Sequence, residues 1–310
     1  MKKLLLFLLF LPIQLFAQTG RSVTYEEFDR TPPPLDCIGR IQTHNSGDIS
    51  ADRWSVGCEC LDRKMAEWSE FGKYVSKLGV GYSRIQSGWA RTETQKGKYD
   101  YSWLDEIVDG LVGQNVKPWI SLCYGNPLYG AETTLGATIF TDDKAFAAWD
   151  RYVENTVARY RDRVHVWEIW NEPNISSNTP ESYVKLIEHT CRTIRKVDVS
   201  AKIAAFALAS VDRKFLNAVL DILSAKNERD LFDIVTLHKY YENPDDGDYD
   251  FAVLTEDVHR FNPSLKVVMG ESGCPSKLEF GHALKYHQFD EKIQAKTILR
   301  RMACDFAAGR

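Results

Sequence analysis

The chain has 310 residues, of which 44% are hydrophobic and 26% charged, and its formal net charge is −4. These values are ordinary for a globular protein, and the length allows one large α/β barrel or two small domains. No basic run occurs, which argues against a nucleic-acid partner, and a mildly acidic surface suits a neutral ligand such as a sugar.

The first 17 residues have the pattern of a signal peptide. Lys2 and Lys3 form a charged start, an apolar run follows from Leu4 to Phe16, and Ala17 is a small residue suited to cleavage. The apolar run is too short for a membrane-spanning helix, and no cysteine follows closely to carry a lipid. We therefore expect a secreted or periplasmic protein with no membrane partner; the sequence does not indicate its oligomeric state.

Segments typical of strands and amphipathic helices alternate from residue 53 onward, after an expected N-terminal arm at 18–52. The expected strands are 53–60, 81–85, 117–124, 166–170, 202–208, 232–240 and 265–270. The expected helices are 64–78, 101–112, 143–161, 180–197, 214–224, 251–261 and 291–308. Seven strand–helix units with short connections predict a parallel, right-handed βαβ succession. At this length the pattern favours an α/β fold of the (β/α)8 TIM-barrel type over residues 53–310.

Two further observations bear on the barrel prediction: one argues against an alternative fold, and the other concerns the last strand. A doubly wound sheet would need a glycine-rich phosphate loop after an early strand, whereas Gly79-Val80-Gly81 precedes a strand and lacks a third glycine. We also expect the barrel to lack an eighth strand within this chain. Either residues 18–50 fold back to fill the gap or the barrel is C-terminally incomplete. We expect the second, because three consecutive prolines at 32–34 make a poor central strand.

Two glutamates end the fourth and seventh predicted strands. Glu172 stands where Pro173 stops the fourth strand, and Glu271 follows the apolar run 265–270. Barrels keep their chemistry at these carboxyl ends, where the two positions can face each other. Hydrolysis of a glycosidic bond with retention needs two carboxyl groups roughly 5–5.5 Å apart, one to donate a proton and one to attack the anomeric carbon. The alternative for Glu172 alone is a turn that merely ends a strand, and the second strand-end carboxylate favours catalysis.

Two motifs carry a family resemblance. Trp167-Glu168-Ile169-Trp170-Asn171-Glu172-Pro173-Asn174 resembles the acid/base signature of the retaining glycoside hydrolases of clan A. Val267-Val268-Met269-Gly270-Glu271-Ser272-Gly273 resembles the nucleophile strand of the same clan. The likeness is closest to glycoside hydrolase family 39, with family 5 next, and it covers residues 53–308.

The resemblance implies the catalytic roles. Glu172 would be the general acid and then the general base, and Glu271 would be the nucleophile. Asn171 would bind the sugar hydroxyl next to the anomeric carbon, a contact that strengthens in the transition state. Glu168 shares a strand face with Glu172 by alternation, and it is expected to be a buried supporting carboxylate rather than a catalytic one.

Further positions follow the pattern of the clan. Arg84 ends the second strand and, with a hydrogen bond from Tyr240 or Tyr241, would keep Glu271 ionised. His238 ends the sixth strand and would contact the substrate. The structural alternatives are an ordinary ion pair for Arg84 and a satisfied core histidine for His238.

Aromatic residues near strand ends can stack on sugar rings or fill the core. We expect Trp89 and Tyr124 to line the sugar pocket and Trp119 to lie in the core. The seven cysteines show no zinc spacing, and Cys58 and Cys60, two residues apart on the first predicted strand, would face the same side. An exported chain permits a disulfide, although the spacing indicates no pairing.

The sequence therefore predicts an exported retaining β-glycosidase that acts on poly- or oligosaccharides by double displacement. No cofactor and no metal is expected, because the chain has no His-Glu-x-x-His, no Gly-x-Ser-x-Gly and no phosphate-binding loop. The alternatives are a carbohydrate-binding barrel without turnover and a transglycosylase, which shares every catalytic residue with a hydrolase.

Overall fold

The computed structural model describes residues 39, 42–50, 53–277, 284 and 289–307. Among these residues, a larger compact unit, here called the barrel unit, is drawn from Cys37–Tyr240, Gly247–Ser272 and Asp305–Arg310. A smaller unit is drawn from Tyr241–Asp246 and Gly273–Cys304. The predicted signal peptide and most of the predicted N-terminal arm lie outside the described residues.

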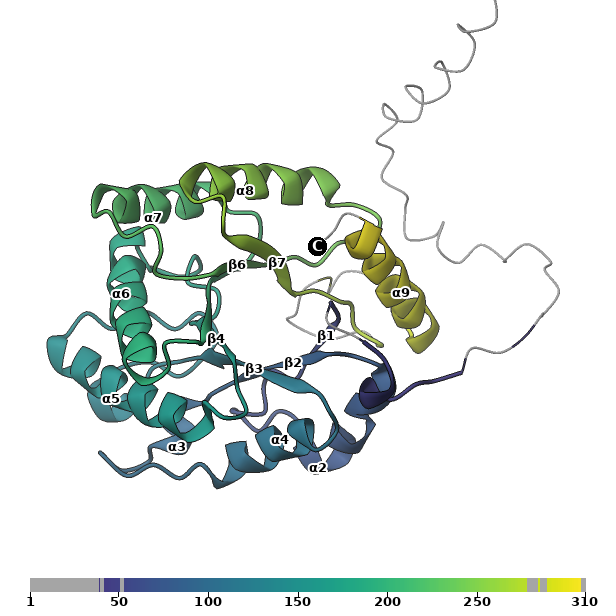
Figure 1. The fold of residues 1–310 in the computed structure, drawn as a ribbon, viewed down its shortest axis with the longest axis horizontal. Coiled ribbons are helices and arrows are strands. Elements are labelled where there is room, and N and C mark those ends of the chain that lie inside the picture. The colour runs from purple at the N-terminus through teal and green to yellow at the C-terminus, as the bar shows by residue number, and fades with distance from the viewer. Residues whose placement is uncertain (1–38, 40–41, 51–52, 278–283, 285–288, 308–310) are drawn as a thin grey trace, which may run out of the picture. The chain divides into compact units, whose positions relative to one another are not determined.

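Seven parallel strands form the sheet of the barrel unit in the order β1 to β7, so that neighbours in sequence are neighbours in the sheet (Figure 1). The strands are β1 (Ser55–Gly57), β2 (Tyr82–Gln86), β3 (Lys117–Leu122), β4 (Val166–Ile169), β5 (Lys202–Leu208), β6 (Ile234–His238) and β7 (Lys266–Glu271). They curve into a nearly closed barrel, and no eighth strand occurs among the described residues. The predicted TIM-barrel class with seven strands is confirmed.

Helices connect the strands and surround the sheet (Figure 1). In the barrel unit they are α2 (Trp68–Phe71), α3 (Trp89–Thr92), α4 (Ser102–Val112), α5 (Asp143–Tyr160), α6 (Pro180–Val197), α7 (Arg213–Ala225) and α8 (Asp248–Phe261), with the 3-10 helices η1 (Ser46–Asp48), η2 (Gly72–Leu78) and η3 (Pro127–Tyr129). Helix α9 (Glu291–Ala307) belongs mostly to the smaller unit. The start of α6 shows why such a helix begins where it does. Thr179 and Ser182 cap each other's backbone N–H groups, and Pro180 occupies the first turn. None of the described helices is both long and apolar enough to cross a membrane.

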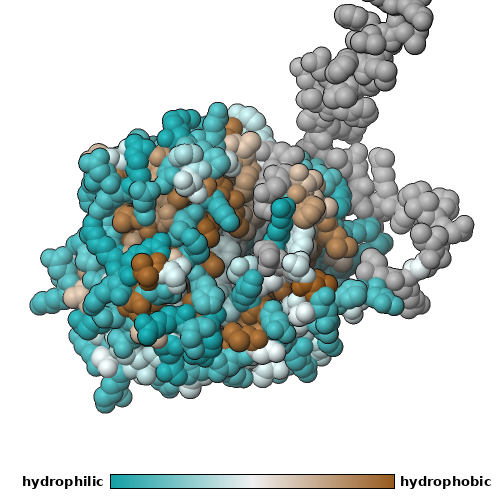
Figure 2. All heavy atoms as spheres, viewed as in Figure 1, coloured by the Kyte–Doolittle hydropathy of each residue, from teal (hydrophilic) through white to brown (hydrophobic). Residues whose placement is uncertain are grey.

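The inner strands β3 and β5 are covered on both sides. β3 and β5 are buried along their whole length except for their first residues, Lys117 and Lys202. Such continuous burial is typical of parallel strands packed between helices and a filled barrel interior. On the face seen in Figure 2, hydrophilic residues cover much of the surface formed by the surrounding helices.

The barrel interior carries a polar layer near the carboxyl ends of the strands. Arg84 on β2, Glu168 on β4 and Thr236 on β6 are fully buried. Arg84 bonds Glu168, and Glu168 bonds Thr236. These strands are not neighbours in the sheet, so the hydrogen bonds between them cross the interior. A layer built from alternate strands is the usual filling of a TIM barrel, although the side chains are ordinarily apolar.

A bulge interrupts β5 near its carboxyl end. The register with β6 shifts between Ala205 and Leu208, and Phe206 and Ala207 adopt φ values of +83° and +40°. Bulges re-aim the groups that follow them. Here the carbonyl oxygen of Ala207 accepts a hydrogen bond of 3.0 Å from the N–H of Glu172, beyond the end of β4.

The first strand is shorter than predicted. The expected strand 53–60 contracts to Ser55–Gly57, because the chain turns after Gly57 and Cys60 adopts φ +70°. Cys58 and Cys60 therefore do not share a strand, and the prediction that placed both on the first strand is wrong. All six described cysteines carry free thiols.

The helix predicted over 64–78 is also corrected. Lys64 has a φ of +55°, which a right-handed helix cannot contain, so the helix begins only at Trp68 and continues as η2. The other element boundaries agree within a few residues, and α6 and β5 coincide with the predicted ranges.

A buried arginine bonds two carbonyl groups within the smaller unit. Arg301 of α9 is 5% exposed and donates to the carbonyl oxygens of Pro244 and Asp246. Cys274, Phe289 and Ile293 form its apolar cluster.

Candidate active site

The carboxyl end of β4 presents Asn171 and Glu172 through an unusual backbone. Trp170 and Glu172 adopt φ values of +64° and +53°. This left-handed region is rare for residues other than glycine, and residues held there are often functional. The hydrogen bond from the N–H of Glu172 to Ala207 fixes the second of these turns. The side chain of Glu172 is thereby brought beside β6.

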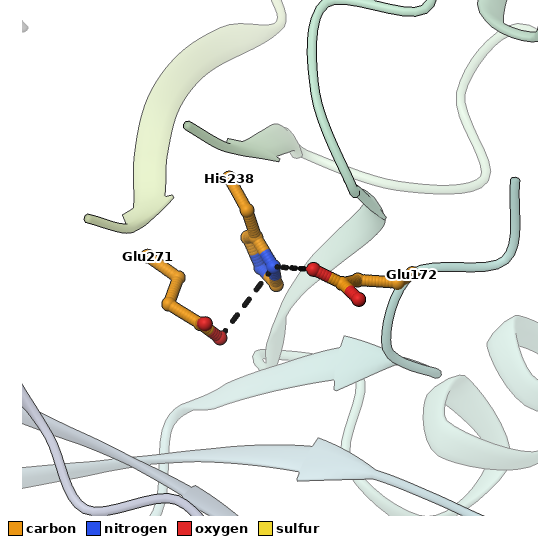
Figure 3. Close-up of side chains that lie close together, drawn as sticks. All are labelled: Glu172, His238 and Glu271. Carbon is orange, nitrogen blue, oxygen red and sulfur yellow. Dashed lines mark hydrogen bonds and ion pairs between the residues drawn. The ribbon is translucent and has the colours of Figure 1, made fainter. Parts of the chain in front are cut away.

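Glu172 and Glu271 lie on either side of the imidazole of His238 (Figure 3). His238 Nδ1 lies 3.1 Å from Oε1 of Glu172 and 3.5 Å from Oε2 of Glu271. One carboxylate oxygen from each glutamate and a ring nitrogen of the histidine all lie within 4.8 Å of one another. The ends of β4, β6 and β7 thus bring together three residues that are far apart in the sequence.

Arg84 connects four acceptors from inside the barrel. Nε donates to Glu168 at 2.7 Å, and Nη2 donates to Oδ1 of Asn171 at 2.8 Å. Nη1 donates to Glu59 at 3.0 Å and to Glu271 at 3.2 Å. A planar guanidinium bonded on all its nitrogens is fixed in position and orientation. Arg84 therefore fixes the side chains of both predicted strand-end residues, Asn171 and Glu271, relative to each other.

Both oxygens of Glu271 receive hydrogen bonds. The hydroxyl of Tyr240 donates to Oε1, and Arg84 donates to Oε2. Burial raises the pKa of the Glu271 carboxyl, but the His238 ring, the Arg84 guanidinium and the Tyr240 hydroxyl together outweigh burial and hold that pKa below its ordinary value. Glu271 is thus kept ionised, and Tyr240 makes the contact expected of either Tyr240 or Tyr241.

Glu168 fixes Arg84 from within the barrel interior. Its Oε2 accepts from Arg84, and its Oε1 accepts from the hydroxyl of Thr236 at 2.6 Å. The Thr236 oxygen in turn accepts from the N–H of Ala207 at 3.0 Å. A hydrogen-bonded chain therefore runs from Arg84 through the barrel interior to the bulge that holds Glu172.

Tyr124 lies next to Asn171 and orients its amide. The Asn171 Nδ2 donates to the Tyr124 hydroxyl at 2.8 Å, while its Oδ1 accepts from Arg84. The ring of Tyr124 is 2% exposed and meets Trp170 edge to face. Tyr124 is therefore part of the site through Asn171, rather than an exposed platform for a sugar.

Trp89 is not brought to the carboxylate pair, which corrects its prediction as a pocket residue. It is fully buried, stacks between Tyr129 and Tyr152, and donates its indole N–H to Glu93 at 2.7 Å. A tryptophan just after β2 has the same sequence signal whether it faces the ligand or the packed helices. Trp119, expected in the core, is 6% exposed.

The loop after β1 contributes two charged residues that the sequence pattern did not indicate. Glu59 bonds Arg84, and burial together with the negative charge of Glu271 raises the pKa of its carboxyl despite Arg84. Arg63 donates to Gln86 at 2.7 Å. The signal that could have found Glu59 is Gly57, since a strand ending there places Glu59 at a strand's carboxyl end.

The three residues of Figure 3 also have the atom types of a metal site. Hydrogen-bond donors, however, already occupy both oxygens of Glu271, and one of them is the Arg84 cation at 3.2 Å. A second cation next to a guanidinium is electrostatically unfavourable. The arrangement is better suited to proton transfer and nucleophilic attack.

Comparison with known sequences places these features in a wider group. A sequence model of glycosyl hydrolases family 39 matches residues 40–266. A β-xylosidase of Caldicellulosiruptor saccharolyticus is 26% identical over 178 residues, which are 49% of this chain and 36% of the relative. A β-xylosidase of Geobacillus stearothermophilus is 24% identical over 159 residues, which are 46% of this chain and 31% of the relative. The chain thus spans about a third of the length of these relatives.

Among solved structures, a family 39 glycoside hydrolase from Bacteroides cellulosilyticus superposes with a TM-score of 0.64 at 20% sequence identity. The superposition covers 82% of this chain and 54% of that structure. At this identity the similarity establishes the barrel fold, and the chemistry has to be argued from the residues at its mouth.

Proposed function

Because this chain belongs to glycosyl hydrolases family 39, the predicted family is confirmed, and we propose that the protein is a retaining β-glycosidase working by double displacement. Glu172 acts as the general acid and then as the general base. Glu271 is the nucleophile. The observation that carries this proposal is the facing pair of carboxylates within 4.8 Å at the ends of β4 and β7.

The environment of Glu271 suits the role of the nucleophile. Glu271 is kept ionised by Arg84, Tyr240 and His238, so its oxygen can attack the anomeric carbon and form a glycosyl-enzyme. Glu172 donates its proton to the leaving oxygen in that step. It then takes a proton from the water that hydrolyses the intermediate, which returns both groups to their starting states.

Asn171 is proposed to bind the hydroxyl next to the anomeric carbon. Its amide is fixed by Arg84 on one side and Tyr124 on the other, so the contact needs no reorganisation during the reaction. His238 bonds Glu172 at 3.1 Å and keeps that carboxyl turned toward Glu271.

The relatives named β-xylosidase make β-xylosides the first substrates to examine. Export is also part of the proposal, and it is supported by the charged and apolar segments of residues 1–17. No cofactor is required for the chemistry described, since both the acid and the nucleophile are carboxyl groups of the chain.

The deciding experiment follows the hydrolysis of 4-nitrophenyl β-xyloside by proton NMR. Double displacement predicts that the β-anomer of the free sugar appears first and that the α-anomer grows in only by mutarotation. Initial release of the α-anomer would refute retention. No turnover of any β-glycoside would favour the carbohydrate-binding alternative, and sugar transfer in preference to hydrolysis would favour the transglycosylase.

Replacing Tyr240 with phenylalanine should move the acid limb of the kcat/KM profile to higher pH. The nucleophile has to be ionised in the free enzyme, so this limb follows the pKa of Glu271. The Tyr240 hydroxyl is one of the groups that hold this pKa below its ordinary value, and its removal lets the pKa rise. The variant then loses activity at acid pH values where the wild type still works.

The measurement is kcat/KM across the pH range for both proteins. Tyr249→Phe is the matched control, because this tyrosine on α8 is 78% exposed. An acid limb that stays in place in Tyr240→Phe would show that the hydroxyl does not stabilise the ionised nucleophile.

A further inference from the structure

The carboxyl group of Glu59 has a prepared position at the end of β1. A Cβ atom added at Gly57 would lie 2.2 Å from Oε2 of Glu59 and 2.9 Å from its Cδ. Glycine at 57 therefore leaves the space into which the carboxyl group folds. From there Glu59 bonds Arg84, which also holds Glu271, so the two carboxylates share one nitrogen, Nη1.

Glu59 is accessible as well as fixed. Its side chain is 17% exposed, compared with 23% for Glu271 and 1% for Arg84. The proposed catalytic carboxylate and Glu59 are thus both open to a ligand, while the cation that joins them is not. An ion pair whose only role was to bury Arg84 would not need a carboxylate that is partly accessible, since Glu168 is already fully buried against the same guanidinium.

The charges around the site are unequal. The carboxylates of Glu59 and Glu271 line its accessible part beside Glu172, which is protonated when the substrate binds, and the single cation Arg84 is shared among several acceptors. The guanidinium of the nearby Arg63 is engaged by Gln86 at 2.7 Å and by Asp62 at 3.2 Å. A sugar that carries a carboxylate or phosphate would therefore meet excess negative charge, whereas neutral hydroxyl groups would meet hydrogen-bond acceptors.

We propose that Glu59 is a specificity-determining residue, which accepts hydrogen bonds from hydroxyl groups of a neutral sugar bound at Glu271 and disfavours a sugar ring bearing an anionic group. This inference rests on the proposed glycosidase function and deepens it. It assigns the substrate class as neutral glycosides, with the discrimination made by one carboxylate of the loop after β1.

The test compares 4-nitrophenyl β-glucoside with 4-nitrophenyl β-glucuronide. The glucoside carries a hydroxymethyl group where the glucuronide carries a carboxylate of similar size. The wild type should prefer the glucoside. Glu59→Gln keeps the size of the side chain and removes its charge. The ratio of kcat/KM on the glucoside to kcat/KM on the glucuronide should therefore fall by about tenfold, mainly through KM. Gly57→Ala displaces the carboxyl group without changing any charge and should lower kcat/KM on the glucoside.

Glu106→Gln on α4 is the matched control, because this glutamate is exposed on an outer helix, and it should leave the ratio unchanged. Equal losses on both substrates in Glu59→Gln would overturn the inference and leave Glu59 as a structural ion pair. An unchanged ratio would overturn it as well.

The proposed function is judged separately, by turnover of 4-nitrophenyl β-xyloside, and the wild type can fail to hydrolyse both the glucoside and the glucuronide. Titration calorimetry of glucose and glucuronic acid then makes the same comparison by binding. A wild-type preference for glucose that narrows in Glu59→Gln supports the inference, and equal affinities in both proteins refute it.

Discussion

Replacing Glu271 with alanine is expected to lower kcat for β-glycoside hydrolysis by about 10⁴-fold or more, since no other group can form the glycosyl-enzyme. Azide added to this variant is expected to restore part of the turnover and to yield the α-glycosyl azide. The alanine leaves space beside Arg84 and Tyr240, which both donate hydrogen bonds to the missing carboxylate in the wild type. A small anion in that space attacks once and inverts the anomeric centre.

The product anomer is read by proton NMR of the purified azide. Glu106→Gln, an exposed charge change on α4, should hydrolyse at the wild-type rate and form no azide adduct. Formation of the β-glycosyl azide by Glu271→Ala would assign the nucleophile to another residue. Near-normal hydrolysis by this variant would have the same meaning.

Replacing Glu172 with glutamine should produce a loss that depends on the leaving group. With an alkyl or sugar leaving group, kcat/KM is expected to fall by about 10³-fold, within the range that a general acid contributes. With a dinitrophenyl leaving group it should change little, because that oxygen departs without a proton. The amide keeps the volume of the side chain and can still bond His238, so the loss reports on proton donation alone.

The measurement is a series of aryl and alkyl glycosides ordered by the pKa of the leaving alcohol. In the Glu172 variant, kcat/KM should fall steeply as the pKa of the leaving alcohol rises, whereas in the wild type it should fall only slightly. Azide should yield the β-glycosyl azide from this variant, the opposite anomer to that from Glu271→Ala, so each variant serves as the control for the other. Equal losses along the series would argue against the acid role of Glu172.

The strand-end glutamates could be predicted because local rules and barrel geometry agree at both places. Pro173 excludes a strand that continues past Glu172, and the apolar run 265–270 leads directly into Glu271, so each glutamate can be recognised at the end of its own segment. The connections between strands are short, which leaves only one parallel topology to consider. The pairing of Glu172 with Glu271 then follows from the order of the strands.

The residues that the sequence misplaced depend on events that no single segment specifies. The bond between Glu59 and Arg84 requires β1 to end at Gly57, which alternation alone does not indicate. Trp89 was expected to face the sugar, but its indole N–H finds Glu93 and its ring finds a buried aromatic cluster. Side-chain partners of this kind are decided by packing, whereas the strands and helices themselves can be recognised from the periodicity of apolar residues.

The left-handed turns at Trp170 and Glu172 have a consequence for attempts to engineer this protein. Each such backbone position costs of order 1–3 kcal/mol when it is not occupied by glycine. A selection for heat resistance alone would therefore favour glycine or asparagine at these positions, and at Glu172 it would remove the proposed acid/base. Thermostabilisation and turnover are opposed at this turn, so libraries built to improve the first should leave the end of β4 unchanged.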